Sequence, residues 1–306
     1  MSGYSVNFEN GNAIITNLNH FDPDKVFDCG QCFNFAPDEH GIYSGIVGKR
    51  VISVYKNSDN TITISNVDKL IFPEIEKYFC LNEDYDDICS DIISSMERNK
   101  INTNVIKQAM SLGNGIRLMK QDKWETLCSF IISQNNNIPR IKKIIKTLCQ
   151  KFGDEFIFNG KTFYSFPTPN QLYLAGVDEI FDCKTGFRAK YLYDAASKVV
   201  SGEINLDEID EADTQKAMEI LMKIKGVGPK VASCVLLFGY GKKDAFPVDV
   251  WVKKVLEKYF DKDFSHQYMG KYSGIAQQYL FYYERYLVNK SPNDIITNSH
   301  TVVNKV

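Results

Sequence analysis

The turn Gly226-Val-Gly-Pro229 is the feature that most restricts the fold of this 306-residue chain. It separates two stretches whose apolar residues recur at helical spacing, the first ending at Ile224, and a proline is well suited to open the second helix. Glycines permit a sharp reversal and let the backbone approach another molecule closely. The unpaired amide groups at the start of a helix favour an anion. The sequence therefore predicts two helices joined by a tight turn that can hold a phosphate group.

Elsewhere the pattern changes from strand to helix near residue 69. Short apolar runs separated by turn residues predict an antiparallel sheet near the N-terminus. The expected strands are Ala13–Thr16, Cys32–Phe35, Ile42–Val47, Arg50–Tyr55 and Thr61–Ile64. The expected helices run from Asp122 to Gln134, Pro139 to Gly153, Ala189 to Val200, Thr214 to Lys223, Pro229 to Tyr240, Val250 to Phe260 and Gly274 to Tyr286. We predict an α+β protein with an N-terminal antiparallel sheet domain and flanking helices over residues 1–112, followed by a mainly helical domain over residues 113–306.

The charge of the chain is nearly balanced, with 36 Lys and Arg residues against 38 Asp and Glu residues. A strongly basic chain is the usual mark of a nucleic-acid-binding protein, so this average argues against such a partner. Binding depends, however, on where the charges lie. Cations gather in the helical half at residues 140–151, 184–190, 223–230 and 242–243. We therefore expect a molecule with one cationic face.

The sequence predicts neither a membrane span nor a cofactor. No run approaches the ~20 apolar residues of a spanning helix, and residues 1–6 lack the features of a signal peptide. We expect an intracellular protein, cytoplasmic and nucleoid-associated if the source is prokaryotic. The eight cysteines are expected to be reduced and mostly buried. Cys29 and Cys32 have the spacing of half a zinc site or a redox pair, but no second ligand pair accompanies them, and we expect no metal.

Two charged residues follow the turn, namely Lys230 in the first turn of the second helix and Asp249 within Pro247-Val-Asp249. Taken singly, Lys230 is explained as an exposed or phosphate-contacting lysine, and Asp249 as the cap of the helix that follows it. Together with the glycine turn, the pair resembles the signature of the bifunctional DNA glycosylases of the helix-hairpin-helix superfamily. The turn residues Gly226, Val227 and Gly228, with Lys230, would then hold a DNA phosphate without reading sequence.

This resemblance implies that Lys230 is the nucleophile that attacks the sugar C1′. It implies that Asp249 is the carboxylate that stabilises the developing positive charge and assists the lysine. Only a neutral amine can attack, and at a reference pKa of ~10.4 about one lysine in 2,500 is neutral at pH 7. Burial and the positive end of a helix favour the neutral form. A Schiff base then permits elimination of the 3′ phosphate, so the implied enzyme is a DNA N-glycosylase with AP lyase activity.

A longer segment, Gly115–Ile141, is similar to 8-oxoguanine DNA glycosylases in particular. Its core is Asn135-Asn-Asn-Ile-Pro-Arg-Ile141, and the likeness extends from about residue 27 to residue 286. This family implies a sheet domain that resembles TATA-binding protein. It also implies a monomeric base excision repair enzyme without cofactor, whose partner is duplex DNA containing 8-oxoguanine opposite cytosine.

An enzyme that acts on a base must extrude it from the duplex. The resemblance implies that Phe281 and Cys234 sandwich the flipped base and that Gln277 bonds its Watson–Crick edge. Gly30 would supply the backbone carbonyl that accepts the N7 proton, which 8-oxoguanine has and guanine lacks. Guanine would place two acceptors together and leave the carbonyl unpaired, at a cost of ~1 to 3 kcal/mol. Taken singly, Cys234 and Phe281 are equally explained as core residues.

On the side that the base vacates, the resemblance implies that Asn135, Arg140 and Arg188 contact the orphaned cytosine and that Phe187 intercalates. Taken singly, Asn135 is explained as a helix cap, Arg140 as a surface charge and Phe187 as core. Trp251 stands where many members have a histidine near a DNA phosphate, which is a departure from the family pattern.

Two alternatives remain open at this point. A monofunctional glycosylase for alkylated bases would share the fold, but it has no need of Lys230. A non-catalytic DNA-binding protein would use the turn alone, which leaves the pairing of Lys230 with Asp249 unexplained.

Overall fold

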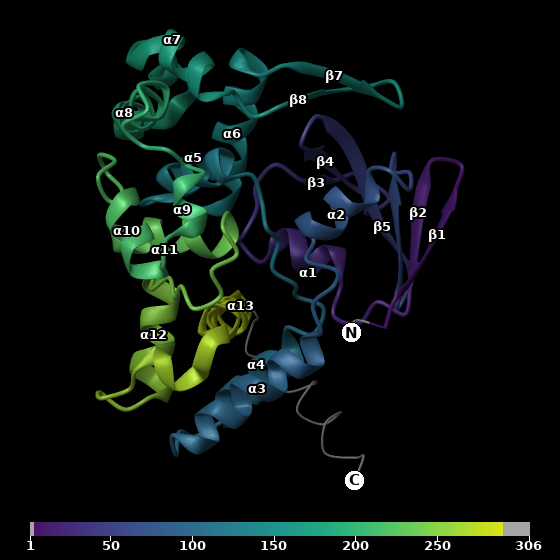
Figure 1. Ribbon diagram of the computed structural model, residues 1–306, viewed down its shortest axis with the longest axis vertical. Helices are drawn as coiled ribbons and strands as arrows, with labels where there is room; N and C mark the ends of the chain where they lie inside the picture. Colours follow the sequence, from purple (N-terminus) through teal and green to yellow (C-terminus); the bar gives the residue numbers. More distant parts are fainter. Residues whose placement is uncertain (1–2, 290–306) are drawn as a thin grey trace.

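Six antiparallel strands form the N-terminal sheet of the computed structural model, which describes residues 3–289 (Figure 1). The strand order is β1-β2-β6-β5-β4-β3. The strands are β1 (Ser5–Glu9), β2 (Asn12–Thr16), β3 (Ala36–Pro37), β4 (Tyr43–Val47), β5 (Arg50–Ser58) and β6 (Thr61–Ser65). Helices α1 (Pro23–Asp28) and α2 (Phe72–Tyr78) add their apolar residues to the same core. Alternate residues of β2, Ala13 and Ile15, are buried, as expected for a sheet with one covered face.

The strand expected at Cys32–Phe35 is wrong, because this segment is irregular and β3 follows it at Ala36–Pro37. Cys32 and Phe35 are buried, so their apolar character reflects core packing rather than a strand. Gly30 has a φ of +83°, and the Gln31 carbonyl accepts a hydrogen bond from the Gln121 side chain at 2.8 Å. The backbone therefore turns where a strand would continue straight. The first strand, β1, was also absent from the predicted elements.

From Tyr85 onward the chain is mainly helical, and this region lies beside the sheet domain (Figure 1). Its helices are α3 (Tyr85–Arg98), α4 (Asn104–Leu112), α5 (Lys123–Ser133), α6 (Ile138–Phe152), α7 (Pro169–Ile180), α8 (Ala189–Val200), α9 (Glu208–Glu211), α10 (Thr214–Leu221), α11 (Pro229–Phe238), α12 (Val250–Tyr259) and α13 (Ser273–Asn289). A hairpin of β7 (Glu155–Phe158) and β8 (Lys161–Tyr164) was not predicted. The predicted α+β class, with an antiparallel sheet preceding a helical region, is confirmed.

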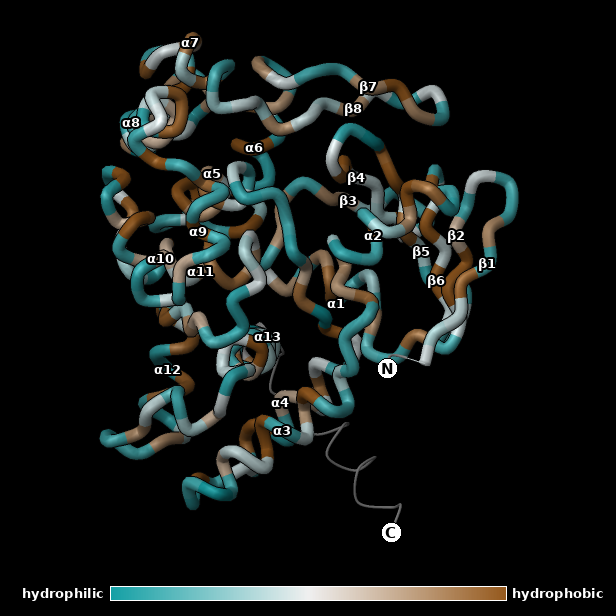
Figure 2. Tube along the Cα trace, viewed as in Figure 1, coloured by the Kyte–Doolittle hydropathy of each residue, from teal (hydrophilic) through white to brown (hydrophobic). Residues whose placement is uncertain are grey.

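Buried residues form two clusters, one under the sheet and one among the helices. Helices α3 and α4 belong to the second cluster, and Figure 2 shows apolar residues recurring along α3. Buried residues up to Leu81 belong mainly to the sheet core, and those from Tyr85 onward belong mainly to the helical core. Cys29 and Met119 are among the exceptions, because each packs in the other core. The predicted domain boundary, between residues 112 and 113, lies further along the chain than this change of core. Residues 290–306 of the expected second domain lie outside the described residues.

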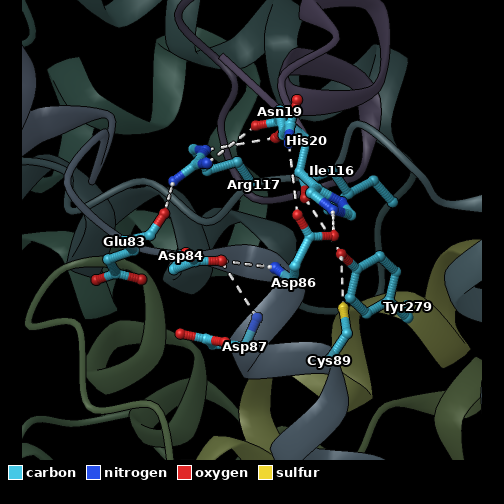
Figure 3. Close-up of polar contacts among 10 residues, drawn as sticks. All are labelled: Asn19, His20, Glu83, Asp84, Asp86, Asp87, Cys89, Ile116, Arg117 and Tyr279. Carbon is cyan, nitrogen blue, oxygen red and sulfur yellow. Dashed lines mark hydrogen bonds and ion pairs between the residues drawn. The ribbon is translucent and has the colours of Figure 1, made fainter. Parts of the chain in front are cut away.

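Arg117 fastens the two regions together. Its side chain is 2% exposed, and its guanidinium lies 4.4 Å from the centre of the Tyr85 ring. The guanidinium donates hydrogen bonds to four backbone carbonyls, those of Cys80 at 2.7 Å, Asn19 and Glu83 at 3.1 Å and His20 at 3.4 Å. Figure 3 shows this side chain between the Asn19–His20 loop and Glu83. The cation therefore joins the loop after β2, the connection into α3 and the segment that leads into α5.

None of the helices in residues 3–289 combines the length and apolar character that a membrane span requires. Within the same residues, no three His, Cys, Asp or Glu side chains cluster so as to hold a metal ion. Cys29 and Cys32 are buried free thiols, and burial raises the pKa of each to about 12.

We expect Arg117→Met to lower the free energy of unfolding by at least about 3 kcal/mol, because it leaves several buried carbonyls without a donor. Urea denaturation followed by circular dichroism measures the loss. Arg98→Met is the control, since Arg98 is exposed and its side chain hydrogen-bonds the Ser95 hydroxyl rather than buried carbonyls within residues 3–289. Its effect should stay within about 0.5 kcal/mol. Equal stabilities of the two variants would contradict the role of Arg117.

Candidate active site

The predicted turn between two helices is present, and it is anchored to α8. Helix α10 ends at Leu221 and α11 begins at Pro229, with Gly228 as its N-cap. Gly226 has a φ of +80°, and a Cβ atom there would overlap the ring of Tyr191 on α8. The Lys225 amide donates to the Asp194 carboxylate at 2.8 Å. The turn thus needs a glycine at position 226 for both conformation and space.

The turn offers backbone amides to an external acceptor, although not from every predicted residue. The Val227 amide donates to the Ile224 carbonyl at 3.0 Å, and the Val227 side chain is buried. The amides of Gly226 and Gly228 have no acceptor among the described residues. Of the turn residues predicted to hold a phosphate, Gly226 and Gly228 keep amides without an acceptor among the described residues, whereas Val227 packs the turn onto the core. The phosphate contact stays a prediction.

A cavity of about 610 Å³ lies beside this turn and contains the proposed catalytic and base-recognition residues. Its walls come from the loop after α1, the ends of α5 and α6 that face each other, α11, the start of α12, and α13. The predicted residues that line it are Gly30, Lys230, Cys234, Asp249, Gln277 and Phe281. Gly30 and Phe281, which are 251 positions apart in the chain, are thus brought to one cavity.

Lys230 extends into this cavity from the first turn of α11. Its Nζ lies 3.3 Å from Ser133 Oγ and 5.4 Å from the centre of the Phe130 ring. Ser133 Oγ donates its own proton to the Phe130 carbonyl at 2.8 Å, so the hydroxyl presents a lone pair to the amine. The contact orients the amine toward the cavity. Sequence reasoning missed Ser133, whose only signal was its position at the end of α5.

Asp249 is both a helix cap and a cavity residue. Its Oδ1 accepts hydrogen bonds from the amides of Trp251 at 3.0 Å and Val252 at 2.8 Å. The carboxylate is therefore fixed at the N-terminus of α12, where the helix dipole stabilises an anion. The predicted cap is confirmed, and it holds the carboxylate at the cavity wall, while the catalytic role of Asp249 stays a prediction. Trp251 lines the same cavity, with the Lys254 Nζ 4.7 Å from its ring centre.

The base-recognition candidates line this cavity from three separate elements. Burial raises the pKa of Cys234 to about 11, so its thiol is neutral at pH 7. A Cβ at Gly30 would lie 3.2 Å from Phe281 Cε1, which places the Gly30 backbone directly against that ring. Gln277 Oε1 is buried without a hydrogen-bond partner among the described residues. The cavity thus presents an aromatic face, a neutral thiol, an unsatisfied amide oxygen and a backbone segment without a side chain.

The four residues predicted for the orphaned base lie outside the cavity lining. Asn135, Arg140 and Phe187 are exposed, and Phe187 is 51% exposed on the 3-10 turn Gly186–Arg188. Arg188 is only 3% exposed and donates to the backbone carbonyls of Gln134, Asn135 and Thr185. In this arrangement Arg188 holds the Asn135 loop, and Asn135 itself has a φ of +48°.

A glycine turn with free amides, next to a cavity with a lysine and a capped aspartate, defines the class of helix-hairpin-helix base excision glycosylases. Residues 13–127 match the family model described as "8-oxoguanine DNA glycosylase, N-terminal domain". Residues 128–268 match "HhH-GPD superfamily base excision DNA repair protein". The chain belongs to the 8-oxoguanine DNA glycosylase family of this superfamily.

Individual relatives agree with this membership. A probable N-glycosylase/DNA lyase of Methanothermobacter thermautotrophicus is 30% identical over 211 residues, which are 59% of this chain and 67% of that protein. The structure of MBOgg1 with a low-affinity DNA ligand is 41% identical, with a TM-score of 0.87 over 94% of this chain and 99% of that one. The Clostridium acetobutylicum 8-oxoguanine glycosylase/lyase, bound to duplex DNA with cytosine opposite 8-oxoG, is 37% identical, with a TM-score of 0.85 over 94% of this chain and 100% of that one.

We expect Gly226→Ala to destabilise the protein by about 2 kcal/mol, because it combines an unfavourable positive φ with overlap of the Tyr191 ring. Gly228→Ala is the matched control, since Gly228 has an ordinary φ and open space around its Cα. Its free energy of unfolding should change by less than about 0.5 kcal/mol. Thermal or urea unfolding distinguishes the two glycines, and an equal loss at both would contradict the geometry.

Proposed function

We propose that this protein removes 8-oxoguanine from duplex DNA and then cleaves the strand at the abasic site, with Lys230 as nucleophile and Asp249 as electrostatic partner. The proposal rests on one observation, which is that Lys230, Asp249 and Gly30 all line the same cavity. Relatives named N-glycosylase/DNA lyase support the reaction type. The relative bound to 8-oxoG opposite cytosine supports the choice of base and of the opposing base.

The reaction divides between the two charged residues. The neutral amine of Lys230 donates its lone pair to C1′, and the bond from C1′ to the base breaks with its electron pair leaving on the base, which takes up a proton. Positive charge develops on the sugar as this bond breaks, and the fixed carboxylate of Asp249 stabilises it. Ser133, by accepting a hydrogen bond from Nζ, leaves the amine lone pair free to point into the cavity.

Strand cleavage follows from the covalent intermediate. After attack, the lysine nitrogen loses a proton, the sugar ring opens, and a Schiff base forms between Nζ and C1′. The Schiff base acidifies the C2′ proton, whose removal expels the 3′ phosphate by β-elimination. Water then hydrolyses the Schiff base, which restores the Lys230 amine and releases the cleaved strand as an aldehyde.

Recognition of the extruded base follows from the cavity walls. The Phe281 ring and the neutral Cys234 thiol would contact its two faces, and Gln277 its Watson–Crick edge. The Gly30 carbonyl would accept the N7 proton. Asn135, Arg140 and Phe187 lie on exposed segments, where they would meet the orphaned cytosine and the gap in the stack. Arg188 would act there through the loop carbonyls that it holds.

We expect Lys230→Gln to abolish the covalent adduct that borohydride traps between the wild-type protein and duplex DNA containing 8-oxoguanine opposite cytosine. The glutamine has no nucleophilic amine, while its length is retained. Lys262→Gln, which changes an exposed lysine outside the cavity, should form the adduct normally. Base release by the wild-type protein without an adduct would indicate a monofunctional glycosylase, and DNA binding without base release would indicate a non-catalytic protein.

We expect Asp249→Asn to slow excision at least about 100-fold, because it removes the charge that faces the developing cation. Asparagine is an equally good N-cap, so the stability of the protein should change little. Asp213→Asn makes the same change at the N-cap of α10, outside the cavity, and should leave excision unaltered. Single-turnover rates and DNA affinity from fluorescence anisotropy provide the measurements. Unchanged turnover of Asp249→Asn would remove Asp249 from the mechanism.

A further inference from the structure

The backbone carbonyls of residues 28–31 differ in whether they accept a hydrogen bond from the protein, and this difference bears on recognition of the base. The Asp28 carbonyl accepts from Arg285 Nη1 at 2.6 Å, the Cys29 carbonyl from Gln278 Nε2, and the Gln31 carbonyl from Gln121 Nε2 at 2.8 Å. No described residue donates to the Gly30 carbonyl. Within this run, therefore, the acceptor left free is that of the glycine which lines the base cavity.

Gln31 also fixes the peptide unit that contains this carbonyl. Its side chain is 1% exposed and fully used: Nε2 donates to the Val26 carbonyl at 2.9 Å and the Arg117 carbonyl at 2.8 Å, and Oε1 accepts from the Met119 amide at 3.0 Å. One buried amide group thus ties the loop after α1 to the segment that leads into α5. These three bonds restrict the residue directly after Gly30.

We propose that Gln31, Gln121 and Gln278 act as a carbonyl clamp, a set of positioning residues that keep the Gly30 carbonyl directed into the cavity and thereby set the preference for 8-oxoguanine. The inference rests on the proposed function, in which this carbonyl accepts the N7 proton. None of the three residues was predicted from the sequence as part of the site.

Rejection of guanine explains why the Gly30 carbonyl must be held in a fixed direction. Guanine presents an acceptor at N7, so an acceptor held opposite it is left unpaired. A glycine at positive φ is conformationally permissive, and its peptide unit turns easily when nothing holds its neighbours. A carbonyl that turned aside would relieve the clash with guanine and lose the bond to 8-oxoguanine. Selectivity therefore depends on bonds that lie on both sides of Gly30.

The test compares two reactions of the full-length protein on duplex DNA. Excision of 8-oxoguanine needs the Gly30 carbonyl, whereas strand cleavage at a preformed abasic site needs Lys230 but no base. In Gln121→Glu, which is isosteric but lacks the donor to the Gln31 carbonyl, we expect excision to slow about tenfold, the effect of losing roughly one good hydrogen bond. Abasic-site cleavage should stay within about twofold. Gln31→Met, which removes all three side-chain bonds without adding charge, should show the same split more strongly.

Gln267→Glu is the matched control, because Gln267 is exposed and is not among the residues that line the cavity, and both of its rates should equal those of the wild type. A purely structural role would lower both reactions together in the clamp variants, and that outcome would overturn the proposal. An unchanged ratio of the excision rate to the abasic-site cleavage rate in Gln121→Glu would also overturn the proposal. This measurement suffices if Gln31→Met does not fold. Failure of the wild-type protein to cleave abasic DNA would instead contradict the proposed function.

Discussion

The buried guanidinium of Arg117 is the interaction on which the rest of the structure depends. Its described partners are four backbone carbonyls and the Tyr85 ring, so the cation is satisfied by main-chain dipoles from loops that are distant in sequence (Figure 3). Because a buried cation is costly unless every donor is used, the loops are held in one arrangement. The segment that carries Arg117 continues directly into α5, which ends at Ser133 in the cavity wall.

The connection that Arg117 makes between the two regions gives the sheet domain a role beside the helical glycosylase domain. The helical half supplies Lys230, Cys234, Asp249 and the C-terminal helix α13, while Gly30 comes from the loop that follows α1, next to the sheet. The cavity is therefore complete only when the two regions are correctly joined. Gln31, next to Gly30, accepts and donates hydrogen bonds along the segment that Arg117 fixes. The proposed catalytic pair and most of the proposed base-recognition residues thus come from the helical half, whereas Gly30 comes from the loop next to the sheet.

Much of this could be predicted from the sequence, because the informative signals were local. Caps, the glycine turn and apolar periodicity placed the seven predicted helices close to their observed bounds, whereas helices such as α3 and α7 had no predicted range. The Lys230–Asp249 pair followed from chain order and resemblance. The apolar run Cys32–Phe35 was misassigned because burial alone does not distinguish a strand from a loop packed into a core. Ser133, Gln121 and Gln278 went unnoticed because their roles arise from long-range hydrogen bonds. A glutamine's partner cannot be found from sequence spacing when it lies in another domain.

The proposed recognition of the base by the main-chain carbonyl of Gly30 has a consequence for how such enzymes diversify. A side chain that reads a base can be exchanged by one codon change, but a carbonyl is common to every residue and cannot be substituted. At position 30 itself, replacement brings a Cβ within 3.2 Å of Phe281 and strains a positive φ, so the position tolerates little variation. New base preferences would therefore arise first among the residues that surround Gly30, because those residues would set the direction of its carbonyl oxygen.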